Sequence, residues 1–556
     1  MEKAVLLQHL SMQNKLGTKI AVLSCIRKGK KSEWFYTFVF LLAIDREKHA
    51  DQNKIIKNRF IYTMDKKPKV TVIGAGFAGI SAAALLAKDG CDVTVIEKNE
   101  MAGGRARTWS KDGFLFDMGP SWYWMPDVFE NFYQIFGKKT ADFYELKRLN
   151  PSYRIYFGKE QNIDVPATLE ELYELFEKLE PGSSKNLDSF LAQAKYKYDV
   201  GMNEYVFKPS HSVMEYFDPR LAISGIKLQL LGNMRKHVHQ LFKNEQLRKL
   251  LEFPVLFLGA TPQNTPALYS LMNYADLVLG TWYPIGGMHK IVEAMQSIAE
   301  QQGVKFLFNT EVDKISVEDG IANKLLTNQG NFATDFVVGN ADYHHIEEKL
   351  LDKAYRNYDE KYWQSRTMAP SCLLFYIGLN KKLNNILHHN LFFDEDFDAH
   401  AEEIYTNPKW PDKPLFYACC PSVTDESVAP VGCENLFFLI PIAPDLEDSD
   451  AKREEYFNLL LERFKILTGN DIKDDIIFKR SYAMKDFVED YHAFKGNAYG
   501  LANTLKQTAF LKPKMKSKVT NMLYTGQLTV PGPGVPPAII SGQVAAKEII
   551  KKLKKA

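Results

Sequence analysis

The chain has 556 residues, which is too long for one compact core, because domains usually contain roughly 100–200 residues. Hydrophobic residues make up 46% and charged residues 25%, which is typical of a globular protein and argues against disorder or a multi-span membrane protein. Lys and Arg number 70 against 68 Asp and Glu, so the net charge of +2 lacks the basic excess that a nucleic-acid backbone requires. We expect two or three domains and no nucleic-acid partner.

The cysteines show no C-x-x-C spacing of the kind that metal or redox sites use. We therefore expect reduced, buried thiols and a cytosolic compartment. Cys419 and Cys420 lie in a stretch that alternates like a strand, so their side chains should point to opposite faces. The six cysteines are Cys25, Cys91, Cys372, Cys419, Cys420 and Cys433.

Residues 1–63 precede the first convincing strand. We predict that they are an extension upstream of a start at Met64 and have no fold of their own. Their apolar run, 34–44, is shorter than the about 20 residues that cross a bilayer. It also lacks the position and the small-residue cleavage site of a signal peptide. A membrane-touching helix is the alternative for this segment.

Residues 69–97 carry a dinucleotide-binding pattern: a buried strand, a glycine turn, a helix over 80–88 and a second strand that ends at Glu97. In such a turn the first glycine permits the tight bend, the second lets a pyrophosphate approach, and the third lets helix and strand pack closely. The acid at the end of the second strand accepts hydrogen bonds from ribose hydroxyls. The predicted dinucleotide-binding residues here are Gly74, Ala75, Gly76, Phe77, Ala78, Gly79, Glu97 and Lys98.

A glycine pair and two arginines follow directly: Gly103, Gly104, Arg105, Ala106 and Arg107. A nicotinamide-binding domain has no reason for this segment, whereas in flavoproteins of the amine oxidase and carotenoid desaturase type it closes over the FAD pyrophosphate. No second glycine turn after a strand occurs in the sequence. We therefore predict FAD, and no separate NAD(P)H domain.

The remaining flavin-binding segments lie far along the chain. A strand after Gly303 leads through Val312, whose backbone should meet the adenine, into a meander that reaches 337–342. Near the end, a short strand over 522–525 leads through Gly526 and Gln527 into a proline-rich turn and a helix over about 538–553. Two prolines at the helix start remove N–H donors, so Val535 and Ala538 would have to donate to the flavin.

In order along the chain, these motifs resemble the bacterial-type phytoene desaturase family of FAD-dependent carotenoid oxidoreductases, over essentially all of 69–553. The run Gly119-Pro-Ser-Trp-Tyr-Trp-Met-Pro126 looks most like the Bacteroidetes-like members. The chain departs from the family's usual Pro-Gly-Ala-Gly-Val-Pro-Gly at Pro533 and Pro537. The motifs that carry the match are the glycine turn with Glu97, 103–106, 116–124, 283–288, 340–342, 496–500 and 531–536.

The resemblance implies an α/β fold: a Rossmann-type FAD-binding domain of amine oxidase topology over 64–124, 281–345 and 490–556, with an inserted mixed-sheet and helical substrate domain over 125–280 and 346–489. It implies desaturation of a C40 polyene, phytoene towards lycopene, by hydride transfer to flavin. The sequence leaves the electron acceptor open, with oxygen and a quinone as the candidates. Asp218 and Arg220 match a suspected acid/base position, although a helix N-cap at Asp218 explains them as well. Trp122, Tyr123 and Trp124 are the candidates to line a polyene tunnel.

We find no metal-spaced His/Cys cluster, and His388-His389 reads as a surface pair because adjacent residues do not face one another on a helix. A cytoplasmic enzyme held peripherally at the membrane is expected, with part of the helical region and the basic tail 547–556 as contacts.

The alternatives are another carotenoid oxidoreductase of the same fold, namely a hydroxycarotenoid 3,4-desaturase, a ketolase or an isomerase, and a flavin amine oxidase. The last would need an aromatic cage and a lysine-held water, and no lysine motif singles itself out.

Overall fold

The computed structural model describes residues 9–13, 19–23, 67–216, 232–504 and 506–555, and the chain divides into two units. One unit contains residues 1–66 and 552–556. In it, β1 (His9–Gln13) pairs antiparallel with β2 (Lys19–Leu23), and the rest of the predicted extension 1–63 lies outside the described residues. Residues 67–551 form the second unit, to which the following description applies.

A five-stranded parallel sheet forms the cofactor-binding half, in the order β11-β4-β3-β15-β21. β3 is buried along nearly its whole length, as an apolar strand covered on both faces should be. α2 follows β3 and leads to β4, which confirms the predicted strand–helix–strand unit. α10 and α16 pack against α2. The elements are β3 (Lys69–Ile73), α2 (Phe77–Lys88), β4 (Asp92–Ile96), α10 (His289–Gln301), β11 (Lys305–Leu307), β15 (Phe336–Gly339), β21 (Met522–Tyr524) and α16 (Val535–Leu553).

Between β11 and β15 the chain forms an antiparallel meander, as predicted. It consists of β12 (Val312–Glu318), β13 (Ile321–Thr327) and β14 (Gly330–Ala333). Its first residue, Val312, lines the same cavity as the ends of the parallel strands.

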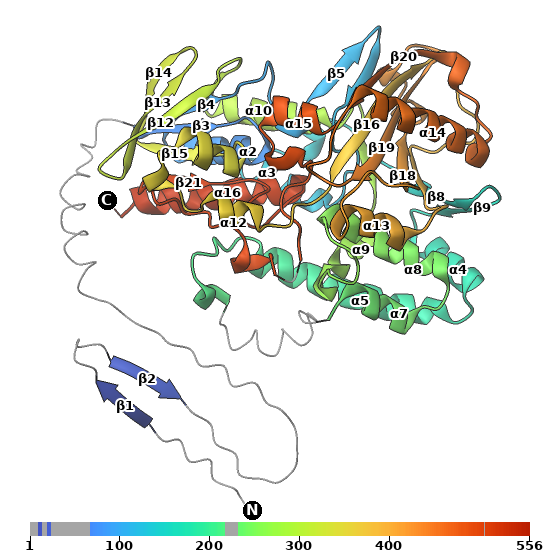
Figure 1. Cartoon of the computed structure of the whole chain (residues 1–556), viewed down its shortest axis with the longest axis horizontal. Coiled ribbons are helices and arrows are strands. Elements are labelled where there is room, and N and C mark those ends of the chain that lie inside the picture. Colours follow the sequence, from blue (N-terminus) through green and yellow to red (C-terminus); the bar gives the residue numbers. More distant parts are fainter. Residues whose placement is uncertain (1–8, 14–18, 24–66, 217–231, 505, 556) are drawn as a thin grey trace, which may run out of the picture. The chain divides into compact units, whose positions relative to one another are not determined.

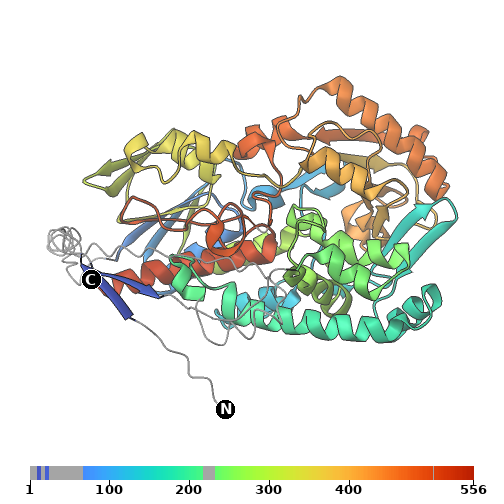
Figure 2. The same ribbon diagram turned by 60° about the horizontal axis from the view of Figure 1, so that its bottom comes forward.

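A seven-stranded mixed sheet forms the other half, in the order β20-β16-β19-β18-β17-β8-β9. α14 (Asp450–Thr468) covers one face with apolar side chains such as Leu460 and Phe464, and the helices of the 169–274 region gather on the other side (Figures 1 and 2). α14 ends at Gly469, whose φ of 77° is left-handed, as is common for glycine after a helix. The strands are β8 (Tyr153–Gly158), β9 (Gln161–Val165), β16 (Ser371–Leu379), β17 (His389–Phe392), β18 (Phe416–Cys419), β19 (Glu434–Ile442) and β20 (Ile476–Tyr482).

The region 125–280, part of the predicted mixed-sheet and helical domain, contains β7 (Leu146–Arg148), β8 and β9 beside its helices. β8 pairs in parallel with β17, more than 200 residues later, so no local pattern could place it in the sheet. Asp218 and Arg220 lie outside the described residues. The helices of this region are α3 (Pro126–Gln134), α4 (Leu169–Leu179), α5 (Ser183–Val200), α7 (Met234–Leu241), α8 (Glu245–Glu252) and α9 (Leu271–Tyr274).

Smaller elements connect the two sheets. β5 pairs with β6, and β10 pairs with β7. They are β5 (Thr108–Lys111), β6 (Phe114–Asp117), β10 (Trp282–Pro284), α11 (Tyr343–His345), α12 (Glu360–Gln364), α13 (Phe397–Tyr405) and α15 (Met484–Tyr491).

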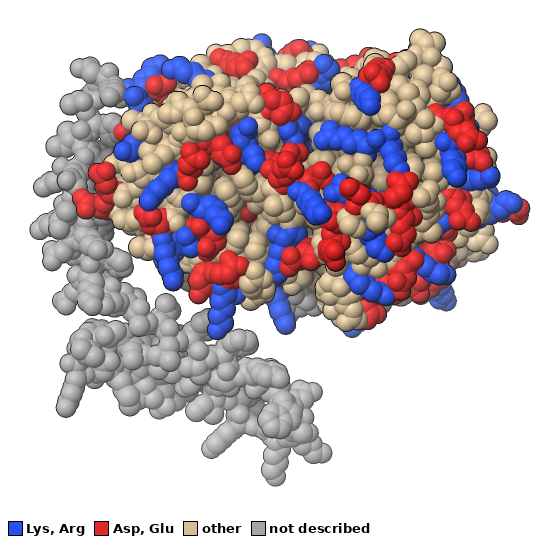
Figure 3. All heavy atoms as spheres, turned by 45° about the horizontal axis from the view of Figure 1, so that its top comes forward, with Lys and Arg blue, Asp and Glu red and all other residues tan. Residues whose placement is uncertain are grey.

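On the face shown in Figure 3, basic and acidic side chains are interspersed, in keeping with the small net charge. Among the described residues, no helix has both the length and the apolar character needed to cross a membrane.

Candidate cofactor and substrate cavity

A cavity of about 390 Å³ begins at the carboxyl ends of the parallel strands. Gly74 follows β3, Glu97 follows β4, Asn340 follows β15 and Gly526 lies two residues after β21, and all four line it. Ligands of open α/β sheets bind at this edge. The cavity extends from there to side chains of the seven-stranded sheet, so it joins the two halves of the unit.

The glycine turn has the geometry that a pyrophosphate site needs. Gly74 has a φ of 97°, a region that side chains disfavour. A Cβ on Gly79 would lie 2.2 Å from the Gly74 carbonyl oxygen, so only glycine lets α2 begin this close to β3. α2 carries no acidic residue in its first turn, and its N-terminal amides face the turn.

Glu97 is buried, and its carboxylate organises the same turn. It accepts hydrogen bonds from the backbone N–H of Ala75 at 2.7 Å and of Asn99 at 2.9 Å. Burial raises the pKa of Glu97, and the two N–H donors and the Arg107 charge oppose this shift. The carboxylate lines the cavity where ribose hydroxyls are expected.

Arg105 lies in the cavity wall. Its guanidinium lies over the Tyr491 ring at 5.2 Å and donates to the Asn497 carbonyl at 3.3 Å. With its amide oxygen turned toward Arg105, Gln527 accepts from both terminal nitrogens at 3.1 and 3.2 Å. The buried Nε has no partner among the described residues. Burial lowers the Arg105 pKa, and the Asp342 carboxylate opposes this shift. A buried cation with donor capacity left over suits an anionic ligand.

Arg107 has a different role, although the sequence placed both arginines in one loop. It forms ion pairs with Glu100 and Asp490, and Nε donates to the Tyr491 hydroxyl at 3.4 Å. It is 5% exposed and is not part of the cavity wall. Arg107 therefore anchors the loop that carries Arg105.

Val312 lines the far end of the cavity beside two stacked imidazoles. The rings of His345 and His492 lie 3.9 Å apart and nearly parallel. Burial lowers the pKa of His345 to about 3, so this ring is neutral. Lys98 donates to the Glu489 carbonyl at 2.6 Å at the same end. The flat faces of these two rings, beside the first residue of β12, suit stacking against a purine base.

At the opposite end, the turn before α16 brings Gly526, Gln527 and Val535 to the cavity. Ala538 also lines it, but its N–H donates to the Gly534 carbonyl at 3.0 Å. The expectation that this N–H donates outside the helix is therefore wrong, because it closes the first turn of α16.

Most of the predicted residues that the structure describes line the cavity, and the exceptions besides Arg107 are Ala75, Gly79 and Tyr123. Ala75 and Gly79 shape the glycine turn from behind. Tyr123 is fully buried, stacks on Phe129 at 4.4 Å and shares a hydrogen bond of 3.0 Å with Tyr144. Its predicted place in a substrate wall is wrong, because alternation along the chain turns it away from the side occupied by Trp122 and Trp124. The predicted residues in the wall are Gly74, Gly76, Phe77, Ala78, Glu97, Lys98, Gly103, Gly104, Arg105, Ala106, Trp122, Trp124, Val312, Gly526, Gln527, Val535 and Ala538.

The substrate side has a largely apolar wall that sequence reasoning did not identify. Every lining residue from the seven-stranded sheet is apolar, aromatic or a thiol, and the charged lining residues come from the cofactor half. Strand alternation could have marked these positions as buried, but it could not tell cavity wall from core. The wall residues not predicted include Met125, Met272, Cys372, Leu374, Tyr417, Leu439 and Tyr499.

A family model described as flavin containing amine oxidoreductase matches residues 77–550. The chain belongs to this family. The carotenoid 3,4-desaturase of Haloarcula japonica is 42% identical over 487 residues, which cover 87% of this chain and 98% of that protein. The zeta-carotene-forming phytoene desaturase of Myxococcus xanthus is 30% identical over 491 residues, which cover 87% of this chain and 94% of that protein.

Solved structures of the flavin containing amine oxidoreductase fold also match. An oxidoreductase from Methanosarcina mazei has a TM-score of 0.56 at 15% identity, and covers 86% of this chain and 100% of its own. Wild-type putrescine oxidase bound to putrescine has a TM-score of 0.56 at 13% identity, with coverages of 87% and 99%.

These matches confirm the predicted fold class and the predicted family: the chain is an FAD-dependent oxidoreductase of the carotenoid desaturase group within the flavin containing amine oxidoreductase family. The cavity wall fits FAD on structural grounds. The close approach at Gly79 and the Arg105 Nε, which has no partner among the described residues, suit a pyrophosphate, and the Glu97 carboxylate suits a ribose.

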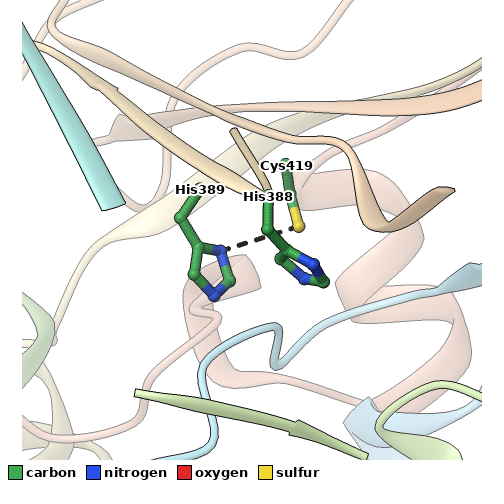
Figure 4. Close-up of side chains that lie close together, drawn as sticks. All are labelled: His388, His389 and Cys419. Carbon is green, nitrogen blue, oxygen red and sulfur yellow. Dashed lines mark hydrogen bonds between the residues drawn. The ribbon is translucent and has the colours of Figure 1, made fainter. Parts of the chain in front are cut away.

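His388 and His389 contradict the sequence-based prediction. They are 4% and 0% exposed, so they are not a surface pair. His389 lies in β17, a strand inside the seven-stranded sheet, and Figure 4 shows both rings beside Cys419. Burial lowers the pKa of His388 to about 3 and that of His389 well below its usual range. Both rings are therefore neutral.

Proposed function

We propose that this flavoenzyme desaturates a long polyene, with phytoene towards lycopene as its reaction. The observation that carries the proposal is the apolar wall of the cavity beyond the dinucleotide site. A C40 hydrocarbon offers no polar group to bind, so its affinity must come from apolar burial, at about 25 cal/mol per Å². Trp122, Met272, Leu374 and Leu439 provide such surface.

FAD held by the glycine turn, Glu97 and Arg105 would supply the hydride-accepting chemistry for this reaction. The chain's own residues position and shield the reacting bond. The aromatic and aliphatic wall orients the polyene and excludes water, and Arg105 with its partner Gln527 holds the cofactor's anionic part. The adjacent carbon gives up a proton, for which Asp218 remains the predicted acceptor and Arg220 its predicted neighbour. Oxygen or a quinone remains the proposed electron acceptor.

A second candidate is 3,4-desaturation of a carotenoid end group. It is favoured by one observation, the 42% identity to the carotenoid 3,4-desaturase of Haloarcula japonica. An amine oxidase activity has less support, because Lys98 is the one lysine that lines the cavity within the described residues, and it is engaged at the adenosine end.

The test expresses the full chain in two bacterial strains, one that accumulates phytoene and one that accumulates a hydroxylated carotenoid with a saturated 3,4 bond. A Gly79→Ala strain serves as a control with weakened FAD binding. New coloured polyenes from phytoene support the first proposal, and their absorption spectra count the double bonds added. Conversion of the hydroxylated substrate alone supports the second, and no conversion in either strain refutes both.

We also propose that the enzyme binds membrane surfaces peripherally from the cytoplasmic side. Its polyene partitions into bilayers, and the apolar side chains of Met214 and Phe207 are 70% and 37% exposed. Lys547 of α16 lies 4.9 Å from the Phe207 ring, so a basic helix end accompanies exposed apolar groups. Liposome flotation of the full chain and of a variant lacking 551–556 tests the tail, and unchanged flotation removes it from the proposal.

A further inference from the structure

Two antiparallel strands bring a thiol and an imidazole face to face. His389 of β17 and Cys419 of β18 are directly opposed in the strand register, so their side chains project from the same face. His388 precedes β17, and its ring lies 4.5 Å from that of His389. The sequence did not reveal this cluster, because its histidines and cysteine are 30 residues apart and meet only through strand pairing.

The separations match those of metal ligands. The His389 Nδ1 atom lies 3.8 Å from the Cys419 sulfur. Metal–sulfur bonds of about 2.3 Å and metal–nitrogen bonds of about 2.0 Å place the two ligand atoms about 3.5–3.7 Å apart in tetrahedral or trigonal geometry. One ligand atom from each of His388, His389 and Cys419 lies within 4.8 Å of the other two. A separation of 4.8 Å exceeds the one that these bond lengths require by about 1 Å, so a side-chain movement of that size would let all three atoms reach one ion.

The two ring nitrogen atoms of His388 have the surroundings of a metal-binding histidine. Nδ1 of His388 lies 2.9 Å from the Thr424 hydroxyl, and its buried Nε2 has no partner among the described residues. A metal-binding histidine typically donates its other N–H to an oxygen in this way. An unpartnered buried nitrogen atom costs stability unless something binds it, so Nε2 of His388 is the atom of this ring that is open to an ion, whereas His389 would bind through Nδ1, which faces Cys419.

Space for an ion lies beside the cluster. A small cavity of about 20 Å³ borders two of the three residues, His388 and Cys419, together with Asp117, and has room for one water-sized particle. The Tyr417 hydroxyl, 2.6 Å from Nδ1 of His389, is an oxygen that could complete the coordination. If a metal takes Nδ1, this hydroxyl keeps the Ser121 hydroxyl as its acceptor at 3.0 Å.

We propose that His388, His389 and Cys419 bind a thiophilic d10 cation, Zn²⁺ or Cu⁺, behind the wall of the substrate cavity. Thiolate and imidazole together favour these ions over Mg²⁺ or Ca²⁺. One thiolate and two neutral imidazoles around Cu⁺ have no net charge, which suits a buried site, and Asp117 can balance the extra charge of Zn²⁺.

The ion would fasten β17 to β18 behind Trp122 and Tyr417, two residues of the cavity wall. The Trp122 ring stacks on His389 at 4.1 Å, with 9° between the planes. Metal binding must displace the thiol proton of Cys419, so it should weaken as the pH falls.

The test uses the full chain, purified with a tag that binds no metal from cells grown with added zinc or with added copper. Zinc and copper are measured by mass spectrometry relative to protein. We expect about one equivalent of one of the two ions in the wild type, which identifies it, and at least a tenfold loss in Cys419→Ser. Cys420→Ser is the matched control, because the neighbouring thiol is equally buried but contacts Ser422 and Glu434 instead.

Bound FAD absorbance and melting temperature establish that each variant is folded. Metal-free wild type and Cys420→Ser should both give a thiolate-to-cobalt charge-transfer band with Co²⁺. Absence of the metal from wild type in both cultures overturns the proposal, and so does equal retention by a folded Cys419→Ser. If Cys419→Ser does not fold, lack of the cobalt band in wild type overturns it.

Discussion

Gly79→Ala should weaken FAD binding, although alanine is the better helix former. Alanine gains about 1 kcal/mol over glycine inside a helix. Its Cβ, however, would lie 2.2 Å from the Gly74 carbonyl oxygen and 2.6 Å from Nδ2 of Asn340. Ordinary contacts are about 3.5 Å, so α2 and the turn must separate by about 1.3 Å. Overpacking of this kind costs about 1–3 kcal/mol, which exceeds the gain in helix propensity.

The displaced groups are those that hold the pyrophosphate turn. Nδ2 of Asn340 donates to the Gly74 carbonyl at 2.9 Å, and the α2 amides face the same place. We expect at least a tenfold weaker FAD affinity, equivalent to about 1.4 kcal/mol, and a lower melting temperature.

The assay is titration of flavin-free protein with FAD, followed by flavin fluorescence. Gly158→Ala is the control, because a Cβ there meets nothing within 4 Å, and its affinity should match wild type. If Gly79→Ala binds FAD within about twofold of wild type, the close approach of helix and turn does not limit binding, and the reasoning is refuted.

Two further predictions concern buried charges. Arg105→Lys keeps the charge but loses the planar fork that meets Gln527, so FAD affinity measured by calorimetry should fall about tenfold, and an unchanged affinity would contradict this role. Burial raises the pKa of Asp276 to about 7 despite hydrogen bonds from Tyr153 and Thr281. A raised carboxyl pKa stabilises the fold at low pH, and this contribution disappears as the pH rises from about 4 to about 7. Asp276→Asn should therefore flatten the decline of melting temperature across this range, and an unchanged slope would show that other groups cause it.

Local chemistry made the cofactor half predictable. The glycine turn, the acid at Glu97 and the Gly103–Ala106 loop each occupy a few consecutive residues, and their spacing is imposed by a ligand of fixed size. Strand and helix periods likewise located β3, α2 and β4 in the predicted dinucleotide-binding unit. The prolines at 536 and 537 indicated where α16 starts. They could not show that the Ala538 N–H bonds to the Gly534 carbonyl, because that bond forms only when the helix closes its first turn.

The sequence by itself therefore determined the dinucleotide-binding fold, the choice of FAD and the aromatic residues 122–124 as candidates for the wall of an apolar cavity. Tertiary structure decided which rings line that cavity, because Trp122 and Tyr123 are neighbours with opposite surroundings. The tertiary structure also decided that His388 and His389 are buried. A strand's pairing partners are set by the whole sheet, and burial against β8 and β18, from distant parts of the chain, turned an apparent surface pair into a neutral cluster beside Cys419.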